Sequence, residues 1–205
     1  MESRRDRPRL TRDLILDTAL AAIDEGGIAA CTMRRVAKRL GVEAMSLYWH
    51  VDGKDALLDG VIARLMEQTL LPRPERELSW REGFEDFARR FRAMSLAHPQ
   101  AVPLLAQRAW SAYQAAGRIA SDGLTALEAA GFDRMSAVRA TRVVSRYVVG
   151  FALGEAGSPP VPRPGGEAEP ALQALLDDLA VDDQTVLFEF GLETLLDGLE
   201  ARLAR

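Results

Sequence analysis

The sequence predicts an all-α protein with a small N-terminal helix-turn-helix head and a larger helical body. Apolar residues recur at helical spacing along the 205 residues, and no segment shows the sustained apolar–polar alternation of a half-buried strand. Glycine, proline and capping residues divide this pattern into short helices. The longest apolar run, residues 147–154, is far shorter than the ~20 residues that a membrane-spanning helix needs.

Four helices are predicted in the N-terminal part, over about residues 12–25, 32–40, 43–50 and 54–71. Thr11 and Thr32 are the N-cap candidates of the first two helices. Gly26-Gly27 ends the first helix and Gly41 ends the second, because glycine tolerates the backbone conformations that stop a helix.

Two prolines, Pro72 and Pro74, break the helical pattern after the fourth helix. We therefore predict two domains, residues 1–71 and 72–205. A capping box from Ser79 to Glu82 begins a long helix that Pro99 and Pro103 interrupt. Further helices are predicted over about residues 107–130, 133–155, 171–179 and 183–205. The segment 157–170, rich in proline and glycine, is expected to be a loop.

The net charge is −4, but its distribution along the chain is uneven. Residues 1–54 carry a net charge of +2, and the remaining residues carry −6. A basic end joined to an acidic body indicates either a small module that binds a polyanion or a solvated basic tail. Charge alone favours neither interpretation.

Few residues suit metal or covalent chemistry. A single cysteine, Cys31, cannot form an internal disulfide or nucleate a zinc site, and there are only two histidines. No nucleophile–base or carboxylate pair has a catalytic spacing. These observations lead us to expect a protein that is not an enzyme and that holds no metal or cofactor. Because a secretory signal is also missing, we expect it to be soluble and cytoplasmic.

The residue pattern over positions 32–50 predicts a helix, a tight turn and a second helix. Apolar residues such as Val36 and Leu47 can pack the two helices together. The outward candidates are nearly all hydrogen-bond donors: Arg34, Arg35, Lys38, Ser46, Tyr48, Trp49, His50 and Lys54. Phosphate oxygens need donors, and a helix-turn-helix places its second helix in the major groove. This pattern favours binding to double-stranded DNA.

The run GGIAACTMRRVAKRLGVEAMSLYWHVDGKDALLDGV, residues 26–61, resembles the N-terminal helix-turn-helix of TetR-type transcriptional regulators. Residues 80–91 and 187–203 are more loosely similar to the start and the last helix of that family's ligand-binding domain. The resemblance implies an all-helical homodimer that binds a palindromic operator and is released by a small ligand. We expect such a protein to act as a repressor.

The resemblance also assigns roles to the DNA-binding candidates. Arg34 corresponds to an arginine that reaches a guanine edge, a contact worth about 1–3 kcal/mol of discrimination. Expected phosphate contacts are Thr32, Ser46, Tyr48, His50 and Lys54, and Trp49 is expected to support the short helix. Core packing is the alternative for Tyr48 and Trp49, and an ordinary solvated position is the alternative for Arg34 and His50.

The start of the expected recognition helix departs from the family. Polar base readers stand there in the family, whereas this sequence has Ala44 and Met45. These two side chains can only touch thymine methyl groups or fill space. The operator sequence therefore cannot be transferred from other members of the family.

A small-molecule site is predicted in the body, where large apolar residues gather in a region that prolines interrupt. Interrupted helices do not pack end to end, which leaves room for a cavity. The candidate lining residues are Phe84, Phe87, Phe91, Met94, His98, Leu105, Arg108, Trp110 and Tyr113. A plain core stripe is the alternative for each aromatic residue. Family members that bind a tetracycline–magnesium chelate use histidines where this sequence is apolar, near Leu70 and at Leu105, so we expect a largely apolar effector without a metal.

The helices over residues 133–155 and 183–205 resemble the pair that forms the family's intersubunit four-helix bundle. Their apolar residues exceed what one buried face needs, which makes interface candidates of Val138, Val144, Val148, Phe151, Leu187, Phe190, Leu195 and Leu199. Internal packing is the alternative. Pairing would place two recognition helices about 34–36 Å apart, which matches successive major grooves.

The predicted mechanism is a shift between two conformers of the dimer. The effector favours a conformer with a different head spacing, and the helix over residues 54–71 transmits the change. The main alternative is a helical adaptor for a protein partner with a vestigial DNA-binding head. A stable homodimer would favour the regulator, and a monomer would favour the adaptor.

Overall fold

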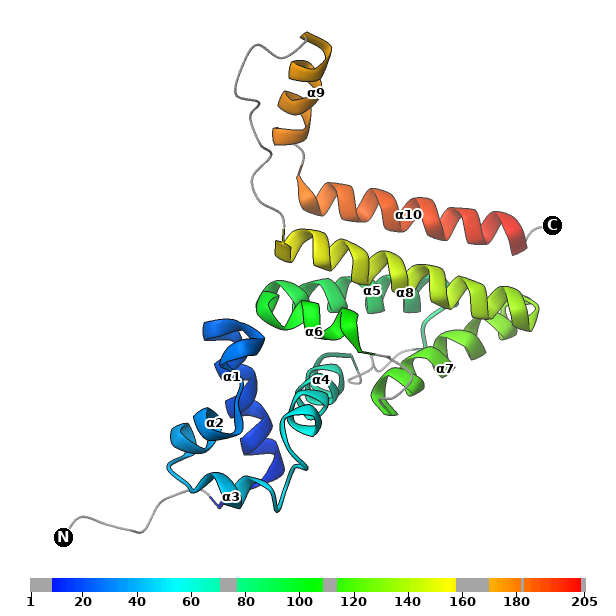
Figure 1. The fold of residues 1–205 in the computed structure, drawn as a ribbon. Coiled ribbons are helices and arrows are strands. Elements are labelled where there is room, and N and C mark those ends of the chain that lie inside the picture. Colours follow the sequence, from blue (N-terminus) through cyan, green and yellow to red (C-terminus); the bar gives the residue numbers. More distant parts are fainter. Residues whose placement is uncertain (1–8, 71–76, 109–113, 158–169, 182, 204–205) are drawn as a thin grey trace. The chain divides into compact units, whose positions relative to one another are not determined.

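The computed structural model describes residues 9–70, 77–108, 114–157, 170–181 and 183–203, and every regular element within these ranges is a helix (Figure 1). The all-α prediction is therefore confirmed. None of the described helices is both long and apolar enough to cross a lipid bilayer.

The chain divides into two compact units. The N-terminal unit consists of residues 1–73 and 98–117, and the C-terminal unit consists of residues 74–97 and 118–205. The described residues 98–108 thus belong to the N-terminal unit although they follow the predicted boundary at residue 72. The assignment of separate functions to residues 1–71 and 72–205 stays a prediction.

The complete helical segments in the described part of the N-terminal unit are α1 (Arg12–Ala30), α2 (Met33–Leu40), α3 (Ala44–Leu47), α4 (Lys54–Leu70), the 3-10 helix η1 (Pro99–Ala101) and α6 (Val102–Gln107). The predicted caps of α1 and α2 are confirmed, since Thr11 Oγ1 accepts from the Leu14 N–H and Thr32 Oγ1 from the Arg35 N–H, both at 3.2 Å. Gly41 ends α2 in the left-handed conformation, with φ 66°.

The predicted end of the first helix at Gly26-Gly27 is a kink. Both glycines leave helical geometry, and Gly27 has φ 71° and ψ 179°. Helical structure then resumes as far as Ala30. The glycine pair therefore redirects α1 without ending it, because residues 28–30 form a further turn.

The core of the N-terminal unit lies between α1, α2 and α4. Its fully buried side chains share an apolar character and include Ile15, Leu16, Ile23, Val36, Leu57, Ile62 and Leu65. Gly60 permits the close approach of α4 to α1, because a Cβ at this position would lie 2.6 Å from a methyl carbon of Leu16. Cys31 is buried in this unit, and burial raises the pKa of its thiol.

The C-terminal unit contains α5 (Trp80–Ala97), α7 (Gln114–Ala129, of which the residues up to Gly117 count with the N-terminal unit), α8 (Arg134–Gly157), α9 (Pro170–Val181) and α10 (Gln184–Leu203). The capping box of α5 is confirmed. The Ser79 N–H donates to Glu82 Oε2 at 2.9 Å, and the Glu82 N–H donates to Ser79 Oγ at 3.3 Å.

The core of this unit lies where α8 packs against α5 and α10 (Figure 1). Each helix contributes buried residues at a spacing of three or four, namely Phe84, Ala88, Phe91 and Met94 from α5, Ala140, Val144, Val148 and Ala152 from α8, and Phe188, Leu192 and Leu196 from α10. This spacing gives each helix one apolar stripe.

One predicted helix, over residues 107–130, is wrong at its start. Gln107 is the last residue of α6, and Arg108 is extended with ψ 141°. The described part of α7 begins only at Gln114. Pro103 lies in the first turn of α6. Proline has no backbone N–H, but N–H groups in the first turn of a helix have no intrahelical acceptor, so proline is tolerated there.

Candidate nucleic-acid interface and associated sites

The second helix of the helix-turn-helix is a single turn, α3. Leu47 anchors it and is completely buried, while Val51 is buried just beyond it. The N–H groups of His50 and Val51 both donate to the Leu47 carbonyl, at 2.9 and 3.0 Å, and so close the turn that follows α3. One buried leucine and a tight turn therefore hold the predicted recognition segment in place.

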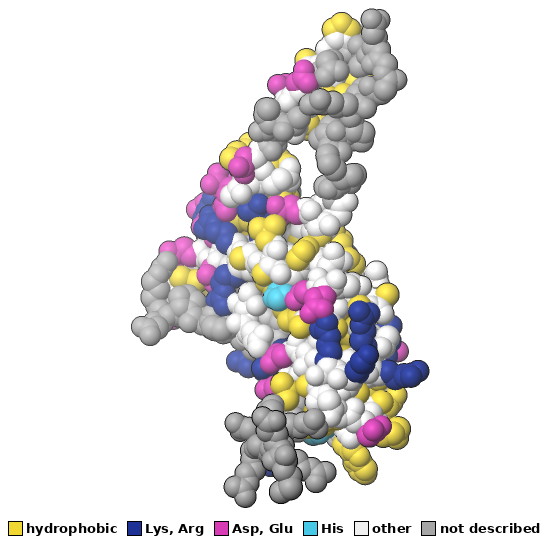
Figure 2. Space-filling model, turned by 90° about the vertical axis from the view of Figure 1, so that its left-hand side faces the viewer, with side chains coloured by type: hydrophobic (Ala, Val, Ile, Leu, Met, Phe, Trp, Pro, Cys, Tyr) yellow, Lys and Arg dark blue, Asp and Glu magenta, His cyan; other side chains and the backbone are white. Residues whose placement is uncertain are grey.

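Four basic side chains surround this segment from α2 and the start of α4. Arg34, Arg35, Lys38 and Lys54 are exposed, and none of them forms an ion pair with another residue in the described ranges. Arg39 differs, because it pairs with Glu25 of α1. Figure 2 shows Lys and Arg side chains gathered on one face of the molecule. Arg34, Arg35, Lys38 and Lys54 are thus cationic donors without a carboxylate partner among the described residues.

Large apolar side chains project beside these donors. Met45 is 71% exposed, Tyr48 46% and Trp49 89%. The core-packing alternative for Tyr48 and Trp49 is therefore wrong, and Trp49 is too exposed to support α3 by packing. The other DNA-binding candidates, Thr32, Ala44, Ser46 and His50, are half-buried.

The predicted effector residues divide between the two compact units. The C-terminal unit contains Phe84, Phe87, Phe91 and Met94, and the N-terminal unit contains His98, Leu105 and Arg108. Trp110 and Tyr113 lie outside the described residues. Phe84, Phe91, Met94 and Leu105 are buried. Phe87 is half-buried, 6.0 Å from Phe91 between ring centres.

Both polar members of this set have protein partners. His98 Nδ1 lies 2.9 Å from Asp24 Oδ2 of α1. Arg108 donates to Asp55 Oδ1 of α4 at 3.1 Å and also to Asp59. These contacts tie the start of η1 to α1 and the end of α6 to α4. The sequence could not reveal them, since the partners lie 49–74 positions away in the chain.

The structure describes no group of three or more histidine, cysteine, aspartate or glutamate side chains that could hold a metal ion. This finding covers only the described residues.

The predicted dimer residues fall into three classes of burial. Val144 and Val148 are buried within the protomer, which corrects their assignment as interface residues: they pack in the core that α8 shares with α5 and α10. Val138, Phe151, Leu195 and Leu199 are half-buried, and Leu187 and Phe190 are exposed.

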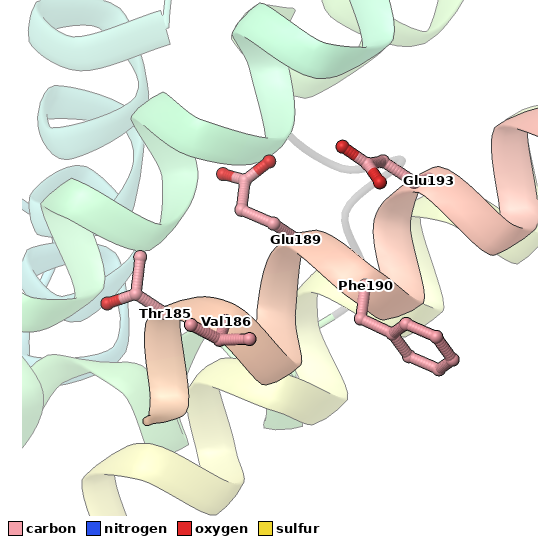
Figure 3. Close-up of a pocket in the computed structure, with 5 residues that line it drawn as sticks. All are labelled: Thr185, Val186, Glu189, Phe190 and Glu193. Carbon is pink, nitrogen blue, oxygen red and sulfur yellow. The ribbon is translucent and has the colours of Figure 1, made fainter. Parts of the chain in front are cut away.

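Sequence reasoning missed three exposed apolar residues of these two helices. Met135 and Val143 of α8 and Val186 of α10 all project from the protomer. Val186 and Phe190 line a depression on α10 with Thr185, Glu189 and Glu193, and Figure 3 shows the Phe190 ring projecting away from the helix. Counting outward positions opposite the buried stripe could have identified them.

Two family descriptions match this chain. Residues 15–61 match "Bacterial regulatory proteins, tetR family", and residues 71–203 match "Tetracyclin repressor-like, C-terminal domain".

Individual proteins are similar along most of their length. A tetracycline repressor of class A from Escherichia coli is 33% identical over 95% of this chain and 92% of the repressor. An HTH-type transcriptional regulator from Saccharopolyspora erythraea is 36% identical over 74% of this chain, which spans only 63% of that regulator's length.

Solved structures also resemble the fold. A TetR variant from Acinetobacter baumannii in complex with minocycline has a TM-score of 0.77 and 30% identity, and 94% of each chain is covered. A structure of BioQ with its double-stranded DNA operator has a TM-score of 0.69 and 28% identity, with 94% of this chain and 99% of BioQ covered.

Proposed function

This chain belongs to the TetR family of transcriptional regulators, and on that premise we propose that it is a repressor that binds a palindromic operator as a homodimer and leaves it when a small, largely apolar effector binds. Members of this family are not enzymes, which confirms the prediction that the chain has no enzymatic activity. The effector, the operator and the direction of regulation are parts of the proposal.

The observation that carries DNA binding is the set of exposed donors around α3. Arg34, Lys38 and Lys54 project without internal ion pairs among the described residues, while Leu47 holds α3 from behind. Phosphate oxygens are the acceptors that such a surface suits, and these contacts make binding strongly dependent on salt. The related BioQ structure contains its double-stranded operator, which supports the same role here.

Homodimerisation is supported by the apolar side chains that project from α8 and α10. Val143, Val186 and Phe190 are exposed to solvent in the described structure, and exposed apolar surface is typical of association sites. A two-fold pair would use the same surface from each copy.

The effector is proposed to bind within the region that matches the family's C-terminal domain. Arg108 could transmit a conformational change from this region to the head, because its hydrogen bonds to Asp55 and Asp59 join the end of α6 to α4. A movement of α6 would act on α4 through these bonds. An effector can shift the conformers only by its difference in affinity for them, typically about 1–3 kcal/mol.

DNA binding is tested by electrophoretic mobility shift with the region upstream of the chain's own gene. We expect a retarded complex that weakens steeply between 50 and 200 mM salt, the range over which a protein with six to ten phosphate contacts loses roughly 10³–10⁵ in affinity. No retarded band at any protein concentration would contradict the proposal. A transcriptional reporter then separates repression from activation.

Dimerisation is tested by light scattering on Phe190→Glu. A carboxylate at this position would disrupt the paired surface, so we expect a monomer that loses high-affinity operator binding. Ala120→Glu, on the exposed side of α7, introduces the same charge elsewhere and should remain dimeric. A monomeric wild-type protein would favour the adaptor alternative.

The effector's chemistry is tested with tetracycline and Mg²⁺. We expect this chelate to leave the DNA complex intact, because the sequence positions that match the family's metal-binding histidines are apolar, as at Leu105. Release of the DNA by the chelate would show that the effector class is wrong without affecting the proposal of DNA binding.

A further inference from the structure

The start of the recognition segment presents apolar surface where base contacts are expected. Met45, Tyr48 and Trp49 occupy positions i, i+3 and i+4 and are all exposed, Met45 at 71%. Side chains at this spacing project from one side of a helical turn. Ala44, immediately before Met45, cannot form a side-chain hydrogen bond.

The structure excludes one of the two roles that the sequence leaves open for Met45, that of filling space inside the head. A residue that fills space inside the head would be buried, as Leu47 is. Met45 has most of its side chain in solvent, so it contributes little to the stability of the free protein. Its apolar surface can gain free energy only from a partner outside the N-terminal unit.

The surrounding charges define that partner. Arg34 and Lys54 are exposed cations without ion pairs among the described residues, so the surface suits a polyanion. The expected partner of the Met45 side chain is therefore an apolar group carried by a polyanion. In the major groove of DNA this group is the C5-methyl of thymine, which the other three bases lack.

We propose that Met45 is a specificity-determining residue that selects thymine in each operator half-site by contact between its side chain and the thymine methyl group. The inference rests on the proposed function, since it requires DNA binding by this surface. Ala44 leaves room for the longer neighbour, and Arg34 reads a guanine by hydrogen bonds at a different position. The half-site then contains one base recognised by its acceptors and one recognised by its methyl group.

The test removes single methyl groups from the DNA. A duplex is selected from a random library with the wild-type protein, and each thymine is replaced in turn by deoxyuridine, which pairs identically but lacks the methyl group. We expect one or two positions per half-site where affinity falls by roughly fourfold, the effect of about one buried CH₂ group. Elsewhere the replacement should have no effect.

Two variants assign the effect to its residue. Met45→Ala should bind the thymine and deoxyuridine duplexes equally well, and its fold should not change because the side chain is exposed. Lys54→Ala should weaken binding to both duplexes by the same factor and keep the difference between them. Circular dichroism on both variants checks their folding.

The outcomes separate this inference from the proposed function. If no thymine methyl affects binding, or if Met45→Ala keeps the same methyl sensitivity, the inference is overturned and DNA binding stands. If the library yields no duplex, both fail.

Discussion

The basic residues of α5 and those around α3 have opposite surroundings. On α5, Arg92 donates to both carboxylate oxygens of Glu155 at 2.7 and 2.9 Å, and Arg89 donates to Glu189 at 2.8–3.2 Å. Arg81 bonds Asp197 at 2.7 Å and Glu200 at 3.0 Å. These arginines join α5 to α8 and α10 within the C-terminal unit.

Around α3, by contrast, Arg34, Lys38 and Lys54 are exposed and form no ion pair with any other described residue. The same chemical groups thus serve two purposes. A guanidinium that already bonds two carboxylate oxygens contributes to internal packing and has little left for a ligand. An exposed cation without such a partner remains available to phosphate. Local pairing, more than residue type or total charge, distinguishes a stabilising arginine from a binding one.

The largest effect is expected at the most buried ion pair. Arg92→Met should lower the free energy of unfolding by about 3 kcal/mol, because it leaves Glu155, whose side chain is 8% exposed, without its cation. Urea denaturation measures this loss. Arg92→Met combined with Glu155→Gln should recover much of the stability. If Arg92→Met alone were as stable as wild type, Arg92 would not stabilise the fold through Glu155. The contrast between the paired arginines of α5 and the unpaired cations around α3 would then be lost.

Arg34→Ala should have the next largest effect, and on DNA binding alone. Loss of a bidentate contact with guanine should weaken specific binding by about 5- to 150-fold, equivalent to about 1–3 kcal/mol. Fluorescence anisotropy with the selected duplex measures the change. Arg142→Ala, at an exposed arginine of α8, serves as the matched control and should bind normally. Equal losses in both variants would indicate a nonspecific charge effect.

Lys54→Ala should have a smaller effect that does not depend on base sequence. Removal of one phosphate contact should reduce the slope of log affinity against log salt by about 1. Titrations at several salt concentrations, with the selected and a scrambled duplex, measure this slope. An unchanged slope would place Lys54 outside the interface.

The smallest expected effect is the pH dependence of the Arg89–Glu189 pair. The hydrogen bond from Arg89 holds the pKa of Glu189 below its ordinary value of 4.5. Because the folded-state pKa is the lower one, the pair stabilises the protein above about pH 4.5, and this stability is lost as the pH falls through the folded-state pKa.

Glu189→Gln should therefore show a shallower loss of stability below pH 4.5 than wild type in acid titrations followed by circular dichroism. Identical acid profiles would indicate that this pair does not contribute.

Sequence reasoning succeeded where a structural feature depends on residues close in the chain. The cap at Thr32, the end of α2 at Gly41 and the capping box at Ser79 each involve partners within a few positions, and all three occur as predicted. The false helix start at Gln107 arose because the apolar pattern continues across the extended residue Arg108.

The sequence by itself determined the all-helical class, the helix-turn-helix and the set of donors that border it, because periodicity and capping are local properties of the chain. Only the tertiary structure decided which of those side chains lack partners. It turned His98 and Arg108 toward carboxylates distant in sequence, buried Val144 and Val148, and left Met45 and Phe190 in solvent. Burial and pairing depend on which helix faces reach one another, and that arrangement is a property of the whole fold.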